Sequence, residues 1–171
     1  HAKRRVAQNY PHCLRPAPVA AARALVRLID SYVAEEDRSG SSTPTIETFV
    51  VNGNEPSLSQ YYSYIWCDVA SGHDDAVQIL NAFFRYLEEM LQDPVRAQTV
   101  DQIVALLFGE DKQAISWGRL LRRGTHQPSE YCLRLRWLAW AVGLVRSVAT
   151  YIEAADFVEL SVPLLSGWDG G

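Results

Sequence analysis

The sequence predicts an all-α fold, a helical bundle of roughly six to eight helices in which amphipathic helices surround a central apolar helix or hairpin. Three observations predict this fold class. Apolar residues recur at three- and four-residue steps along most of the chain, as on one face of a helix. Clusters of Pro, Gly and Ser separate these periodic segments. One segment, Trp137 to Val145, is apolar on every side, which is typical of a helix buried at the centre of a bundle.

In the first third of the chain we expect an arm, one helix and a long loop. Residues 1–16 are basic and turn-rich, so we expect a flexible or docked arm, and residues 17–171 are expected to form a single domain. A helical pattern runs from Pro18 to about residue 36. Thr45 to Val51 alternates weakly, but turn residues follow at once and no partner strand is evident, so we expect a loop.

Two helical segments are expected in the middle of the chain. The first begins near Ser57, continues to Val69, is interrupted at residues 71–74 and resumes from Val77 to Leu91 before Pro94. The second covers Thr99 to Phe108 and is expected to stop at Gly109.

Three further helices are expected in the last third. The helix that contains Trp117 should end near Gly124, because Pro128 interrupts the pattern. The longest helix is expected over about Glu130 to Glu153, and a final helix over Ala154 to Leu165.

Composition restricts the classes of function. A net charge of -4 and a pI near 5.5 argue against a nucleic-acid-binding protein, which normally carries a basic face. The three cysteines have no short spacing, so neither a disulfide framework nor a zinc site is indicated. The four histidines are scattered, and no nucleophile elbow or phosphate loop is present. We therefore expect no catalytic activity, no cofactor and no bound metal.

The segment Ile115 to Leu121 places a glycine between a tryptophan and an arginine inside a helical pattern. A helix-interior Gly costs about 1 kcal/mol relative to Ala, so close approach of another backbone is the expected compensation. The neighbouring Arg119 offers a fork of N–H donors that suits a carboxylate. The segment is therefore predicted to form the floor of a helix-binding groove. A surface Arg beside a packing Gly and a core Trp is the alternative.

Two tryptophan motifs resemble those of the Bcl-2 family of apoptosis regulators. Ser116-Trp117-Gly118-Arg119 resembles the centre of the family's first homology motif, with Ser116 where an Asn is usual, and Gly167-Trp168-Asp169 resembles the second. The two tryptophans lie 51 positions apart, close to the family's separation. Residues 104–109 resemble the family's helix that ends in Leu-Phe.

The chain also departs from the family pattern. Its BH3 signature is absent, and the nearest match has His73 where the family has Gly, an erosion more like that of divergent viral members. Residues 122–128 carry charges and a proline where the family's central hairpin is apolar. No apolar tail follows Gly171, so membrane association is expected only through a tail absent from this chain.

The resemblance implies a groove that receives the BH3 helix of a pro-apoptotic protein. Arg119 would pair with the ligand's Asp, and Gly118 would let a small ligand residue approach closely. Trp117 and Trp168 would serve as packing residues. The apolar walls would come from three segments, namely Leu80, Phe83, Phe84 and Leu87, then Ile103 and Leu107, and finally Leu121. These apolar residues also fit a plain assignment to the core.

The function implied is that of an anti-apoptotic protein that sequesters BH3 proteins in the cytoplasm, with a site of action at the mitochondrial outer membrane. Two alternatives stay open, a pro-apoptotic effector of the same fold and a structural helical interaction module whose groove has closed around Phe83 and Phe84. A homodimer is compatible with each of the three.

Overall fold

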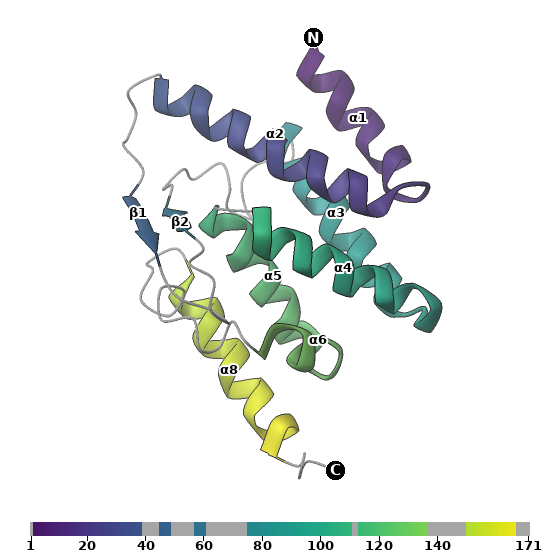
Figure 1. Cartoon of the computed structure of the whole chain (residues 1–171), viewed down its shortest axis with the longest axis vertical. Coiled ribbons are helices and arrows are strands. Elements are labelled where there is room, and N and C mark those ends of the chain that lie inside the picture. The colour runs from purple at the N-terminus through teal and green to yellow at the C-terminus, as the bar shows by residue number, and fades with distance from the viewer. Residues whose placement is uncertain are drawn as a thin grey trace. The chain divides into compact units, whose positions relative to one another are not determined.

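The computed structural model describes residues 2–38, 45–48, 57–60, 75–110, 113–136 and 150–166. These residues form seven helices and one pair of short strands (Figure 1). The helical fold class predicted from the sequence is therefore confirmed. The chain divides into two compact units, His1–Thr43 with Tyr62–Asp111, and Pro44–Tyr61 with Lys112–Gly171. The predicted single domain over 17–171 stays a prediction.

The first unit contains four helices, α1 (Ala2–Leu14), α2 (Pro18–Arg38), α3 (Asp75–Leu91) and α4 (Pro94–Glu110). A tight turn joins α1 to α2 (Figure 1). Helix α2 packs on α4, α3 packs on α4, and α1 packs on α3. The core of this unit includes Leu25 and Ile29 of α2 and Val100 of α4, each at most 2% exposed. Arg23 of α2 also pairs with Glu110 of α4, with Nε 3.0 Å from Oε1.

Residues 1–16 were expected to be a flexible or docked arm, and residues 2–14 of this segment form helix α1. The segment was described as turn-rich, yet α1 contains Pro11. Burial explains this, because Ala7, Tyr10 and Leu14 recur on one face and are 3–5% exposed. Tertiary packing of that face compensates for the backbone donor that proline lacks.

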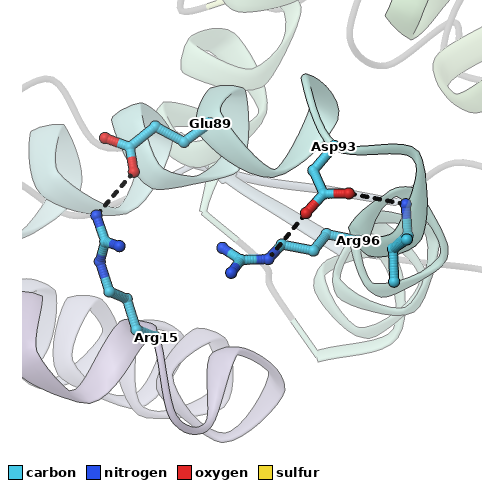
Figure 2. A network of polar contacts seen from close by, with 5 residues as sticks. Arg15, Glu89, Asp93 and Arg96 are labelled. Atoms are coloured by element: carbon cyan, nitrogen blue, oxygen red, sulfur yellow. Dashed lines mark hydrogen bonds and ion pairs between the residues drawn. The ribbon is translucent and has the colours of Figure 1, made fainter.

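Helix α4 begins earlier and ends later than expected. It starts at Pro94 rather than near Thr99 and runs through Gly109 to Glu110. The Oδ1 of Asp93 accepts a hydrogen bond from the Val95 N–H at 3.0 Å, as an N-cap residue does, and Pro94 occupies the first helical position (Figure 2). Arg96 adds an ion pair to the same carboxylate at 3.3 Å. This cap fixes the start of α4.

The second unit contains strands β1 (Thr45–Thr48) and β2 (Ser57–Gln60) with helices α5 (Ala114–His126), α6 (Pro128–Leu135) and α8 (Tyr151–Ser166). The strands are antiparallel, with Thr45 opposite Gln60 and Thr48 opposite Ser57. Helix α5 packs on α8 and on α6, and α6 packs on α8.

The strand pair contradicts two expectations. Residues 45–48 form a strand rather than a loop, and residues 57–60 form its partner rather than the start of a helix. The β-branched residues of β1 favour an extended backbone, and Leu58 had matched a helical period by coincidence over a short stretch. The remainder of that expected helix, through Val69, lies outside the described residues.

The breaks between the last helices are partly as expected. Pro128 separates α5 from α6 and occupies the first turn of α6. The expected helix over Glu130 to Glu153 is interrupted, because Thr150 lies in a turn and α8 begins at Tyr151. The expected central apolar segment, Trp137 to Val145, lies outside the described residues.

Candidate helix-binding site

Helices α3 and α4 carry six of the predicted groove residues. Helical spacing places them on the inward faces of the two helices, which pack on each other within the first unit. The rings of Phe83 and Phe84 meet edge to face, with centroids 5.2 Å apart. All six side chains are at most 2% exposed, namely Leu80, Phe83, Phe84, Leu87, Ile103 and Leu107. In the described structure they are core residues of their unit.

Helix α5 carries the tryptophan motif predicted to form the groove floor. Trp117, Gly118 and Arg119 are buried, as is Leu121 one turn after Gly118. Arg119 is 6% exposed, an unusual burial for a guanidinium, which requires hydrogen bonds or a counter-charge inside a protein. Arg119 does take part in an interaction within the chain. A ligand carboxylate that binds Arg119 would therefore replace a contact that this side chain already makes within the chain.

The predicted site residues fall into both units. The six residues on α3 and α4 belong to the first unit, whereas Gly118, Arg119 and Leu121 belong to the second. Each set is described within its own unit. Trp168 and the segment around His73 lie outside the described residues.

A close helix approach does occur on α5, at a glycine that the sequence argument did not single out. A Cβ built on Gly124 would lie 2.7 Å from Cε2 of Phe157 on α8 and 3.4 Å from Cδ1 of Leu135 on α6. Gly124 was interpreted as the end of its helix, but α5 continues to His126. The sequence offered no signal for this contact, because Phe157 belongs to another helix and approaches Gly124 only in the folded unit.

An ion pair also joins α5 to α8. Nη2 of Arg122 lies 2.9 Å from Oε1 of Glu153, whose side chain is 18% exposed. Arg122 departs from the apolar hairpin that the family resemblance implies. Its position explains the charge, because Arg122 points away from the buried Trp117 side of α5 and is exposed.

The described residues contain no group of three or more His, Cys, Asp or Glu side chains placed to hold a metal ion. No helix among them is long and apolar enough to cross a membrane. A shallow hollow of about 480 Å³ lies over α2, and its described lining comes from Ala20, Arg23, Ala24, Arg27, Leu28 and Ser31.

No family model, curated protein or solved structure matches this chain.

Proposed function

We propose that this chain binds amphipathic BH3 helices and acts as an anti-apoptotic, Bcl-2-like protein that sequesters pro-apoptotic partners in the cytoplasm or at the mitochondrial outer membrane. The observation that carries the proposal is the Trp117-Gly118-Arg119 motif on α5, together with its 51-residue separation from Trp168. A helix with Gly next to Arg offers both a close approach and a carboxylate partner.

The burial of Arg119 supports a role in selecting the ligand. An ion pair formed away from water is screened less by salt and depends strongly on its geometry. A ligand helix that presents an Asp at the matching position would offer the guanidinium a carboxylate in exchange for the contact that it already makes within the chain. A helix without that Asp would offer Arg119 no carboxylate in exchange. The pair would therefore discriminate between ligands, while apolar anchors supply most of the affinity.

A second candidate function is a helical interaction module whose groove is closed. The observation that favours it is the burial of all nine predicted groove residues in the described structure. For a BH3 helix to contact them, the surrounding side chains must move. Exposing large apolar side chains such as Phe83 and Phe84 costs about 1.5 to 3 kcal/mol each, which a ligand must offset.

A titration of the chain with a panel of BH3 peptides tests the proposal. Each peptide is paired with a version whose conserved Asp is changed to Ala, and the heat of binding is measured by calorimetry. We expect some peptides to bind and their Asp-to-Ala versions to bind at least about tenfold more weakly, as for loss of a desolvated charge pair. No binding across the panel would favour the closed-groove candidate.

Substitutions on α5 test the assignment of the arginine. Arg119→Ala should weaken BH3 peptide binding at least about tenfold. Arg122→Ala is the matched control, because it removes the same charge from the same helix at a half-exposed position that pairs with Glu153. Its effect on affinity should be small. Equal affinities for both variants and the unmodified chain would show that Arg119 is not in the binding site.

A further inference from the structure

Helix α1 is an amphipathic helix that lies on α3. Its buried side chains, Ala7, Tyr10 and Leu14, follow the i, i+3, i+7 spacing of a single helical face. Gln8, Asn9 and His12 are exposed, and Val6, which lies one turn before Tyr10 beside the buried face, is 45% exposed. The apolar face of α1 is therefore used for docking, and α3 is the helix on which α1 packs most extensively.

Two polar contacts accompany the docking of α1. The hydroxyl of Tyr10 donates a hydrogen bond to the carbonyl oxygen of Ala21 at 2.8 Å, in a buried environment. Burial raises the pKa of this phenol well above its usual value, with a smaller contribution from Cys13. Directly after α1, Nη2 of Arg15 lies 3.5 Å from Oε2 of Glu89 on α3 (Figure 2). These contacts hold α1 in one register on the first unit.

Helix α3 is also the element that carries Leu80, Phe83, Phe84 and Leu87, four of the nine predicted groove residues. We propose that α1 is a displaceable occupant, within the same chain, of a helix-binding surface on α3. The inference rests on the proposed function, which it deepens by assigning a competitor to the site. Helix α1 has the form of the expected ligand, an amphipathic helix with apolar residues at i, i+3 and i+7.

Two features of α1 limit how strongly it is held on α3. Pro11 lies inside the helix and removes one backbone hydrogen-bond donor. The Arg15–Glu89 pair is exposed on both sides, at 71% and 51%, so water and salt weaken it. The packing of α2 on α4 and of α3 on α4 does not involve α1, and it is reinforced by the Arg23–Glu110 pair. Release of α1 would leave those three helices packed.

A ligand helix would then compete with α1 for α3. The apparent affinity of the unmodified chain is the intrinsic affinity reduced by the fraction of molecules in which α1 is released. If α1 is docked in about nine molecules of ten, weakening its docking raises the apparent affinity about tenfold. The ligand in this scheme is an amphipathic helix whose apolar face resembles that of α1.

Two aspartate substitutions on α1 test the inference in the full chain. Leu14→Asp places a charge at a position 3% exposed and should release α1, whereas Val6→Asp places the same charge at a position 45% exposed and should not. Amide hydrogen exchange reports the release of α1 and the integrity of α2, α3 and α4. We expect Leu14→Asp to bind a BH3 peptide about tenfold more tightly than either the unmodified chain or Val6→Asp. Equal affinities, with α1 amides exchanging rapidly in Leu14→Asp, would overturn the inference.

A second probe separates this inference from the proposed function. A peptide of residues 2–16 is added in trans to each protein, with its Leu14→Asp version as the control peptide. The inference predicts that the peptide binds the Leu14→Asp protein about tenfold more tightly than it binds the unmodified chain, whose α3 surface is mostly occupied. If no BH3 peptide binds any protein but this pattern appears, the proposed function is wrong and the docking surface stands. If the peptide fails to bind the Leu14→Asp protein, the inference is wrong. Should Leu14→Asp disturb α2 to α4, Leu14→Ala is used in its place with the same expected order.

Discussion

The phenol of Tyr10 links the packing of one residue to the pH dependence of stability. It is 5% exposed and donates to the carbonyl of Ala21 at 2.8 Å, and burial raises its pKa above the usual value near 10. Below about pH 10 the phenol is protonated in both states, so its hydrogen bond contributes fully. As the pH rises through about 10, the unfolded chain loses this proton while the folded chain keeps it. The free energy of unfolding must therefore fall above that pH.

Tyr10→Phe isolates this contribution. At pH 8 we expect the unmodified chain to be more stable than the variant by about 1 kcal/mol, the usual net value of a hydrogen bond. The difference should shrink above pH 10 by as much as about 1.4 kcal/mol per pH unit and vanish near pH 11. Urea unfolding of both proteins at pH 8 to 11 measures the difference, because other titrating groups are common to both. A difference that stays constant over this range would contradict the assigned burial of the phenol.

At the scale of elements, the approach of α5 to α8 depends on the absence of a side chain at Gly124. A methyl group there would lie 2.7 Å from the ring of Phe157, which is completely buried and therefore cannot move aside easily. Overpacking of this kind costs about 1 to 3 kcal/mol, which exceeds the gain of about 1 kcal/mol in helix propensity. We expect Gly124→Ala to lower the free energy of unfolding by up to about 2 kcal/mol.

Gly109→Ala is the matched control for Gly124→Ala. Gly109 also lies in a helix, α4, but a Cβ built there has no neighbour within 4 Å. The substitution should leave stability unchanged or raise it by up to about 1 kcal/mol through helix propensity alone. Chemical denaturation of the two variants measures the contrast. Equal effects at both positions would show that Phe157 does not restrict the space at Gly124.

Periodicity predicted α2, α3 and α5 well because each helix buries a continuous apolar stripe over three or more turns. Periodicity did not predict α1, β1 or β2. Helix α1 was not predicted, because it contains Pro11 and has only three buried apolar residues in a turn-rich segment. The strands β1 and β2 are four residues each, too short for a period of two to be distinguished from a helical one. The two strands are separated in sequence by residues 49–56, so the pattern of one strand does not indicate its pairing with the other.

For the whole molecule, the sequence predicted which side chains turn inward but not whether they leave a groove. Phe83, Ile103 and Leu121 were expected to be apolar walls or core, and helical spacing is the same in both cases. In the described structure all three are 1% exposed. The sequence did not predict that α1 packs on α3, because the two helices are separated by about sixty residues. A sequence motif indicates which residues could contact a ligand. Whether another helix of the same chain covers them depends on how the chain folds.

The distribution of exposed apolar residues over the described parts of the molecule has its own consequence. Five of the eight large apolar side chains that are exposed there belong to α8, namely Tyr151, Ile152, Leu160, Val162 and Leu164. We call these five side chains, which lie near both ends of the helix, the α8 cluster. Exposed apolar side chains promote self-association once charge repulsion between molecules is weak. The net charge is -4 at pH 7 and approaches zero near the pI of about 5.5. Attraction between molecules should therefore be strongest near pH 5.5 and decline toward pH 7.5.

Two glutamate substitutions separate the effect of the α8 cluster from that of net charge. Val162→Glu and Val95→Glu each add one negative charge at an exposed valine, 54% and 87% exposed, but only Val162 belongs to the α8 cluster. Both should shift the pH of strongest attraction equally, whereas Val162→Glu should also reduce the attraction at that pH. Static light scattering as a function of concentration, from pH 5 to 8, measures the interaction between molecules. If the two variants behave alike, the loss of an apolar side chain from the α8 cluster has no effect beyond the added charge. Net charge alone would then control association between molecules.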